Sequence, residues 1–219
     1  MATVMITGAN RGIGLELSRQ LAERGDQVIS VSRKSSPELE ALGVRTFDGI
    51  DVTDRRALDS VSAELGDTTL DILINNAGIF TEEPFDALDL DRIRKQFEVN
   101  ALGALQVTSA MESHLVKGAK IILITSRMGS IGDNSSGSYY GYRMSKAALN
   151  MAGVNLAHDF AKRGISVAIL HPGLVATEMT GNYGISTRES AEGLIARIDA
   201  LQLADSGGFW HANGERLPW

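Results

Sequence analysis

Short apolar runs alternate with helical patterns along almost the whole chain, and this alternation restricts the fold more than any other feature. The six runs that we interpret as strands are residues 2–7, 27–32, 44–48, 70–74, 120–125 and 165–170. Strands separated by helices usually pair in parallel, and the helices then cover both faces of the sheet. We therefore predict an α/β fold with a doubly wound parallel sheet in three layers. Residues 1–219 show no linker or internal repeat and are expected to form a single domain.

Two of the helical patterns are long. Residues 86–117 are expected to be mostly helical, with Leu90 and Leu102 among the inward apolar positions and Asn100 in mid-helix. A second long helix is expected from Tyr142 to Arg163. Asp54 and Ser186 are typical helix N-caps, and each precedes a shorter helical pattern.

Most of the expected strands are followed by a polar or glycine-rich motif. The motifs at these ends are Gly8–Gly14, Arg33, Asp51, Asn75–Gly78, Ser126 and Pro172-Gly173. In open parallel sheets, ligands bind beyond the carboxyl ends of the strands. The shared location of the motifs therefore predicts one ligand site at that edge of the sheet.

The first motif is a glycine-rich turn between a strand and a helix. Gly8, Gly12 and Gly14 follow the spacing G-x-x-x-G-x-G. Glycines let the backbone approach a pyrophosphate, and the start of a helix offers free N–H groups. A tight turn in another kind of α/β protein is the alternative, because the spacing differs from G-x-G-x-x-G. The position at the start of the chain favours nucleotide binding.

The pair Tyr142 and Lys146 is the strongest candidate for chemistry. The two residues are four positions apart, so on a helix they share one face. A nearby ammonium stabilises a phenolate and lowers the tyrosine pKa toward the working range of a general acid or base. Ser126 ends a strand and could hold a substrate oxygen. Tyrosine–lysine pairs also occur by chance on solvated helices, so the remaining motifs must support this interpretation.

Composition excludes several functional classes. The net charge of −6 argues against nucleic acid or an acidic membrane as the main partner. Without cysteine, the chain has no disulfides, no thiolate metal site and no cysteine nucleophile. The first residues lack the basic region and the long apolar region of a signal peptide, so we expect none, and no apolar run approaches membrane-spanning length. We expect a cytoplasmic protein that acts on a small molecule and binds no metal.

Together these motifs resemble the short-chain dehydrogenase/reductase family over nearly the whole chain. The matching motifs, in order, are Thr7–Gly14, Asn75–Gly78, Ser126-x-x-Gly129, Tyr142-x-x-x-Lys146 and Pro172-Gly-x-Val-x-Thr177. The C-terminal patterns 205–209 and 214–219 are similar to the branch of the C-factor and Sniffer-like carbonyl reductases. The resemblance implies an NAD(P)-binding Rossmann fold.

The resemblance also implies roles for single residues. The implied catalytic residues are Asn100, Ser126, Tyr142 and Lys146. Tyr142 would be the general acid/base, and Lys146 would lower its pKa and hydrogen-bond the nicotinamide ribose. Ser126 would orient the substrate oxygen, and the backbone carbonyl of Asn100 would hold a water of the proton relay. The implied cofactor contacts are Gly8, Asn10, Arg11, Gly12, Ile13, Gly14, Arg33, Asp51, Val52, Asn76, Ala77, Gly78, Tyr142, Lys146, Pro172, Gly173, Val175 and Thr177.

The implied activity is that of an NADPH-dependent oxidoreductase that interconverts a carbonyl and an alcohol. NAD-selective members carry an acidic residue at the end of the second strand, where this chain has Ser32 followed by Arg33 and Lys34. Arg11 would point toward the same region. We therefore expect NADP(H) to be preferred over NAD(H). The alternative is that Arg33 and Lys34 are ordinary solvated loop charges.

Two segments depart from the family pattern. The loop between Ser126 and Tyr142 is longer, and the segment 178–187 is short, which predicts an open substrate pocket. The residues that could line this pocket are Met128, Ile131, Tyr139, Met179 and Tyr183.

Two other functions are alternatives to the reductase. A nucleotide-binding signalling protein of the C-factor type is the main alternative, although all four catalytic positions are intact. A sugar-nucleotide epimerase would resemble a longer chain. We also expect a homodimer, because family members commonly pair through the two long helices, and the second is rich in small residues such as Ala152, Gly153 and Ala157.

Overall fold

The computed structural model, which describes residues 1–219, contains one parallel sheet of seven strands in the order β3-β2-β1-β4-β5-β6-β7. The strands are β1 (Thr3–Thr7), β2 (Gln27–Val31), β3 (Arg45–Phe47), β4 (Leu70–Asn75), β5 (Leu115–Ile124), β6 (Ser166–His171) and β7 (Gly208–His211). From β1 the chain builds the sheet in one direction to β3, and it then returns to place β4 on the other side of β1. A ligand crevice forms at a point where the strand order reverses in this way. The predicted doubly wound fold is confirmed.

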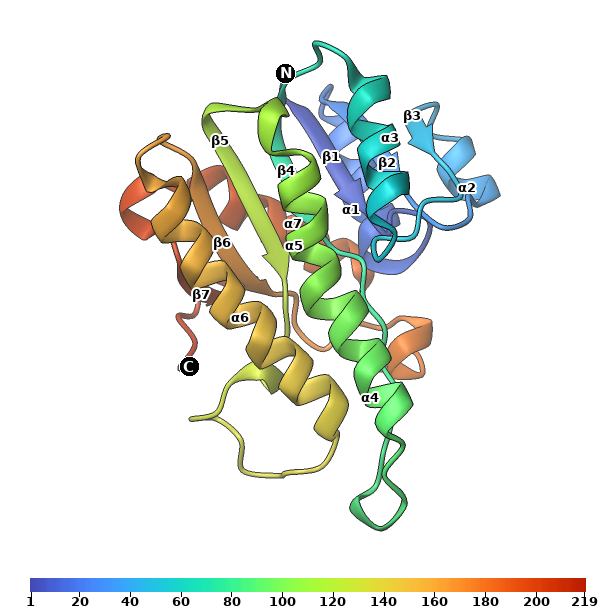
Figure 1. The fold of residues 1–219 in the computed structure, drawn as a ribbon, viewed down its shortest axis with the longest axis vertical. Helices are drawn as coiled ribbons and strands as arrows, with labels where there is room; N and C mark the ends of the chain where they lie inside the picture. Colours follow the sequence, from blue (N-terminus) through green and yellow to red (C-terminus); the bar gives the residue numbers. More distant parts are fainter.

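Helices cover both faces of this sheet (Figure 1). One face carries α1 (Gly12–Glu23), α2 (Pro37–Glu40) and α7 (Thr187–Ala200). The other carries α3 (Arg55–Leu65), α4 (Leu90–Phe97), α5 (Gly103–Ala110) and α6 (Tyr140–Ala161). The π-helix η2 (Glu98–Leu102) joins α4 to α5. The short 3₁₀ turns are η1 (Phe85–Ala87), η3 (Glu112–His114), η4 (Arg127–Gly129), η5 (Glu178–Thr180) and η6 (Leu203–Asp205).

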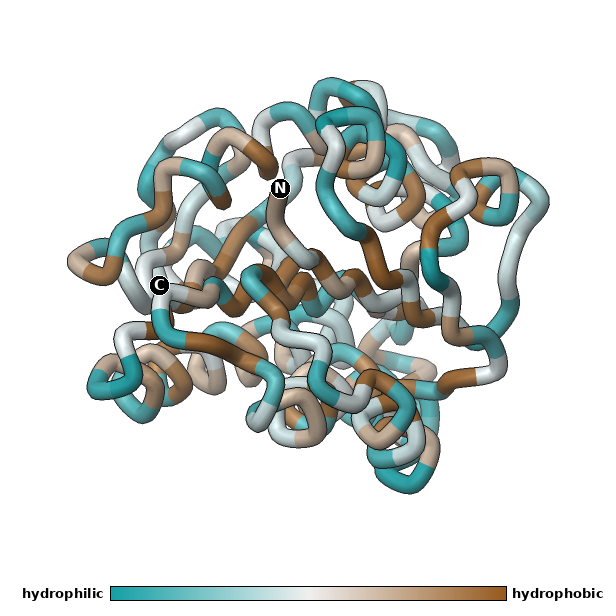
Figure 2. Tube along the Cα trace, turned by 90° about the horizontal axis from the view of Figure 1, so that it is seen from above, coloured by the Kyte–Doolittle hydropathy of each residue, from teal (hydrophilic) through white to brown (hydrophobic).

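The core consists of two apolar layers, one on each side of the sheet. Strand β5 supplies both, with Ile121 and Leu123 in one layer and Ile122 and Ile124 in the other. Figure 2 shows apolar segments running through the middle of the molecule, with polar segments around them. A strand that is buried on both faces has no polar alternate positions, which explains why the strands are continuous apolar runs in the sequence.

The expected helix caps are present. The Asp54 carboxylate accepts hydrogen bonds from the N–H groups of Arg56 (2.9 Å) and Ala57 (3.3 Å) at the start of α3. The Ser186 hydroxyl accepts one from the Glu189 N–H (3.1 Å) at the start of α7. No helix combines the length and the apolar character that crossing a membrane would require.

The structure corrects the prediction for residues 86–117. Helix α5 ends at Ala110, and β5 already begins at Leu115, inside the range that we expected to be helical. The π-helix places an extra residue in the turn, which rotates the following side chains around the axis. Leu102 is therefore 43% exposed rather than buried, and Leu90, in the first turn of α4, is 55% exposed. Strand β7 was missed because it has only four residues and begins with glycine.

Candidate active site

A cavity of about 1410 Å³ lies at the carboxyl ends of the strands. Its walls come from the glycine turn before α1, the ends of β2, β4, β5 and β6, the start of α6 and the segment around η5. Of the residues expected to be catalytic or to contact the cofactor, all except Gly14 and Asn100 line this cavity. The sequence motifs therefore meet in one place, as predicted from their positions after the strands.

The glycine turn is shaped by close backbone contacts. Gly8 has a φ of +66°, and a Cβ atom there would lie 2.9 Å from the Cα of Ala77. At Gly14 a Cβ atom would lie 2.2 Å from the carbonyl oxygen of Gly8, so this glycine allows α1 to pack on the turn. Gly12 faces the cavity, and no side chain caps the N-terminus of α1. The turn and the free N–H groups behind it can receive a pyrophosphate.

Asn76 holds the ends of β1 and β4 together. Its side-chain amide donates to the carbonyl oxygens of Thr7 (3.0 Å) and Gly8 (3.1 Å). In return the Thr7 hydroxyl accepts from the N–H groups of Asn76 and Ala77, both at 3.1 Å. These bonds fix the cavity floor at the point where the two halves of the sheet meet.

Asn100 is buried behind the cavity wall, within the π-helix. Its amide donates to the carbonyl of Ile79 (2.9 Å) and to the hydroxyl of Ser145 on α6 (3.0 Å), and its side-chain oxygen accepts from the Ile79 N–H (2.8 Å). A Cβ atom on Gly78 would lie 3.3 Å from this oxygen and 3.7 Å from the Lys146 ammonium. Asn100 therefore joins the end of β4 to the helix that carries Tyr142 and Lys146.

Tyr142, Lys146 and Ser126 meet inside the cavity. The Lys146 ammonium is 5.7 Å from the centre of the Tyr142 ring and donates to the carbonyl of Ile124 (2.9 Å). Only 4% of Lys146 is exposed, and burial lowers its pKa to about 8. Ser126 lies at the start of η4, where its hydroxyl accepts from the Met128 N–H (3.1 Å).

The pKa of Tyr142 moves in the direction opposite to our expectation. Burial raises it to about 12, and the hydrogen-bonding neighbour Ser126 lowers it only in part. The spacing in the sequence indicates the nearby charge of Lys146, but it does not show that both groups lose their contact with water. Tyr142 therefore holds its proton at neutral pH.

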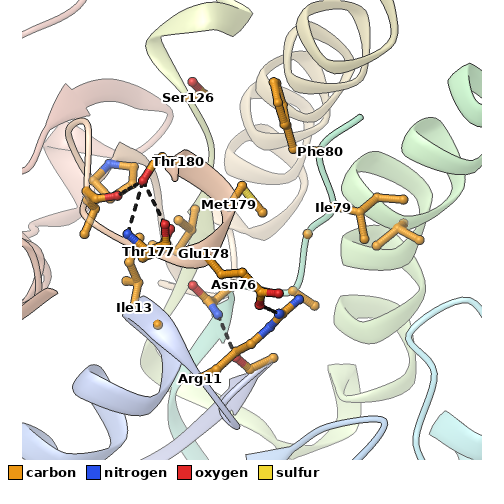
Figure 3. Close-up of a pocket in the computed structure, with 18 of the residues that line it drawn as sticks. Arg11, Ile13, Asn76, Ile79, Phe80, Ser126, Thr177, Glu178, Met179 and Thr180 are labelled. Atoms are coloured by element: carbon orange, nitrogen blue, oxygen red, sulfur yellow. Dashed lines mark hydrogen bonds and ion pairs between the residues drawn. The ribbon is translucent and has the colours of Figure 1, made fainter. Parts of the chain in front are cut away.

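Charged residues stand around the end of the cavity formed by the glycine turn and the end of β2. Arg33 is exposed after β2 and has no ion-pair partner in the structure. Burial opposes ionisation of Asp51, but the N–H and hydroxyl of Thr53 (2.9 and 2.7 Å) bind its carboxylate and keep its pKa below the usual range. Arg11 does not point toward Arg33 as expected. It pairs with Glu178 on the opposite wall (Figure 3).

The part of the cavity around Tyr142 contains residues that the motifs did not indicate. Phe80 meets the Tyr142 ring edge-on, with 5.0 Å between centroids, and also contacts Tyr139 at 5.5 Å. Met128, Tyr139 and Met179 line the cavity as expected, whereas the exposed Ile131 and Tyr183 do not.

His171, at the end of β6, is another cavity residue that sequence reasoning missed. Its Nδ1 atom is buried without a partner, and its ring contacts that of His211, with 4.8 Å between centroids. Burial lowers its pKa to about 3, with smaller contributions from His211, Arg127 and Lys146, so its imidazole is neutral. Only its place before Pro172 could have indicated it.

Comparison with known proteins identifies the family. The family model described as short chain dehydrogenase matches residues 2–187. The chain belongs to this family of oxidoreductases, as its motifs predicted.

Two relatives cover much of the chain. The 1-hydroxy-2-glutathionyl-2-methyl-3-butene dehydrogenase of Rhodococcus sp. (strain AD45) is 42% identical over 226 aligned positions, which cover 100% of both chains. The C-signal protein of Myxococcus xanthus is 41% identical over 154 positions, which cover 68% of this chain and 93% of that protein. Among solved structures, the NADPH-bound carbonyl reductase from chicken fatty liver is similar with a TM-score of 0.91 and 29% identity, covering 100% of this chain and 99% of that one.

The buried ammonium of Lys146 yields a prediction about stability. Its pKa is about 8 in the folded protein and near about 10.4 in an unfolded chain. Between about pH 8 and about 10.4 the unfolded chain binds more protons at this group than the folded protein does, so the free energy of unfolding rises with pH in this range. Below about pH 8 the lysine is charged in both states, and the full cost of burying its charge lowers the free energy of unfolding. Lys146→Met should therefore raise the free energy of unfolding at pH 7 by about 1–3 kcal/mol.

Urea unfolding at about pH 7 and pH 9.5 measures this effect, and the gain should shrink at the higher pH. The upper value stays below the range where Tyr142, with its raised pKa, contributes the opposite slope. Lys162→Met is the control, because Lys162 is exposed at the end of α6 and should have little effect. A Met variant that is less stable than wild type at pH 7 would contradict the prediction.

Proposed function

We propose that the protein is an NADP(H)-dependent oxidoreductase that interconverts a carbonyl and an alcohol. The observation that carries this proposal is the meeting of Tyr142, Lys146 and Ser126 inside a cavity that begins at a glycine turn and a helix N-terminus. The similarity to an NADPH-bound carbonyl reductase supports the same activity.

The cavity fits a dinucleotide. Gly8 and Gly12 with the start of α1 would hold the pyrophosphate, Asp51 and Val52 the adenine, and Asn76 and Ala77 the adjacent ribose. Pro172, Gly173, Val175 and Thr177 would line the nicotinamide end. When bound, the nicotinamide supplies or accepts a hydride. Arg33 would bind a 2′-phosphate, because a guanidinium matches that doubly charged group.

The protein's own contribution is proton transfer and orientation. In the reductive direction Tyr142 donates its phenolic proton to the substrate oxygen, which suits a phenol that is protonated at neutral pH. Ser126 orients that oxygen, and the Lys146 ammonium stabilises the phenolate left behind. Asn100 keeps Ile79 and α6 in register and, through its backbone carbonyl, would hold a relay water. Acid–base catalysis of this type contributes about 10²–10⁴-fold.

The substrate is a small molecule that reaches the apolar wall formed by Phe80, Met128, Tyr139 and Met179. The Rhodococcus relative is by name a dehydrogenase of a hydroxy compound, which supports an alcohol or its carbonyl product as the reacting group. A signalling role is a second candidate because of the identity to C-signal. The intact pair of Tyr142 and Lys146 favours turnover.

The first test of this function is Tyr142→Phe, which removes only the phenolic oxygen. We expect it to abolish NADPH oxidation across a panel of carbonyl compounds while cofactor binding, measured by fluorescence titration, stays within about threefold of wild type. Ser136→Ala, in the exposed part of the loop before α6, is the control and should keep its activity. A Phe variant with near wild-type rates would show that Tyr142 is not the acid.

Cofactor preference is tested at Arg33. Losing one charge-assisted contact costs about 1.5–3 kcal/mol, so Arg33→Ala should weaken NADPH binding about tenfold to a hundredfold. NADH binding should hardly change, because NADH lacks the 2′-phosphate. Arg188→Ala is a control at an exposed arginine of α7. Equal losses for both cofactors, or a wild type that binds NADH more tightly, would refute the preference.

We also propose a homodimer formed through α4, α5 and α6. The small residues that prompted this prediction largely face the sheet: a Cβ atom on Gly153 would lie 2.5 Å from Ile169. The support now comes from Leu102, Met144 and Met151, which are apolar and exposed on the same helical layer. Sedimentation at high micromolar concentration should show a dimer in wild type and a monomer in Met151→Lys. A single 23.5 kDa species in wild type would exclude the dimer.

A further inference from the structure

A buried carboxylate lies where α4 meets the first turn of α6. Glu83 is 2% exposed, although it belongs to the loop between β4 and α4. It forms no ion pair. A buried carboxylate without a basic partner is costly unless donors or another positive group replace the lost water.

Two neutral side chains bind both oxygens of this carboxylate. The Thr81 hydroxyl donates to Oε1, and the Gln96 amide donates to Oε1 (3.3 Å) and Oε2 (3.2 Å). Gln96 is itself fully buried, and its side-chain oxygen accepts from the Thr81 N–H (3.3 Å). Both oxygens of Glu83 thus act as acceptors.

The positive group is the N-terminus of the helix that carries Tyr142. A Cβ atom on Gly141 would lie 3.1 Å from Oε2 of Glu83 and 2.3 Å from the Gln96 amide nitrogen. Both side chains therefore pack closely against the backbone of Gly141. Gly141 is the second residue of a 22-residue helix, and Tyr142 is the third. The N-cap residue Tyr139 offers no capping bond and has a left-handed backbone, so the helix itself provides no anion at this end. A carboxylate stabilises such an end.

We propose that Glu83 is a positioning residue for Tyr142, fixing the first turn of α6 and opposing with its negative charge the positive helix end beside the phenol. This rests on the proposed function only in taking Tyr142 as the acid/base. No motif of the family indicates Glu83, and it does not line the cavity. Its effect on the reaction would pass entirely through the helix.

Few other charges compete with this effect. The Lys146 ammonium lies 5.7 Å from the centre of the Tyr142 ring, and His171 at the end of β6 is neutral. Arg143 on α6 bonds the carbonyl of Gly137 and the hydroxyl of Ser136. The remaining charged groups of α4, its caps and the adjoining loop are exposed, and they are Glu82, Asp86, Asp89, Asp91, Arg92, Arg94, Lys95 and Glu98.

The test uses Glu83→Gln, which keeps the shape and removes the charge. Without the carboxylate the helix end stabilises the phenolate, so the pKa of Tyr142 should fall by about 0.5–1 unit. Carbon NMR of ring-labelled tyrosine, assigned with Tyr142→Phe, measures this in the unliganded protein. The pH limb of kcat/KM for alcohol oxidation should move down by the same amount. Cofactor affinity should stay within twofold, and kcat should fall about tenfold.

Asp86→Asn, at an exposed carboxylate of the same loop, is the matched control and should leave all these values unchanged. Glu83→Asp keeps the charge but withdraws it by one methylene, so it should lower kcat and leave the Tyr142 pKa close to wild type. If Glu83→Gln does not fold, the Asp variant carries the test, and an unchanged kcat overturns the proposal.

A Gln variant whose Tyr142 pKa equals that of wild type, with only its melting temperature lowered, would make Glu83 purely structural and would also overturn the proposal. Because the NMR measurement needs no turnover, the two proposals fail separately. If the wild type is inactive but Glu83→Gln still shifts the Tyr142 pKa, only the oxidoreductase function is refuted. If the wild type is active but Glu83→Gln leaves the Tyr142 pKa unchanged, only the role of Glu83 is refuted.

Discussion

The side-chain amide of Asn100 is the interaction on which the geometry of the site most depends. It binds both backbone groups of Ile79 after β4 and the hydroxyl of Ser145 on α6. Other hydrogen bonds tie α6 to the end of β5, from the Lys146 ammonium to the Ile124 carbonyl and from the Thr125 hydroxyl to the Asn150 side chain. The Asn100 amide adds the directional link from α6 to the segment after β4. The π-helix carries this amide at the wall, and a widened turn of this kind often marks a functional site.

Burial at this junction also sets the electrostatics. The same loss of water lowers the pKa of Lys146 and raises that of Tyr142, so burial opposes the charged form of both groups. Protein stability is therefore reduced where the chemistry is placed, a common feature of functional sites. A ligand that brings polar groups into the cavity would change both values together.

Much of the fold and part of the site could be predicted from the sequence, because the signals were local. Continuous apolar runs identified six strands, and the motif after each lies at the cavity edge. Side chains brought together only by tertiary packing were missed: Phe80 against Tyr142, His171 beside His211, and Glu83 under α6. The inward position of Leu102 was wrong because a period of 3.6 residues does not hold through a π turn. The direction of the Tyr142 pKa was wrong because spacing carries no information about solvent.

The contact between Arg11 and Glu178 has a kinetic consequence. It joins opposite walls of the cavity. If a dinucleotide binds as proposed, it would have to separate this pair on entering, and the pair could re-form when the dinucleotide leaves. Both side chains are largely exposed, and pairs of this kind contribute at most about 1 kcal/mol. That corresponds to a factor of about five in the rate of opening, which dissolved salt would reduce further. The pair is thus a weak ion pair across the cavity, and the rate at which it opens and closes depends on ionic strength. The rate of cofactor exchange should therefore be the step most sensitive to the salt concentration.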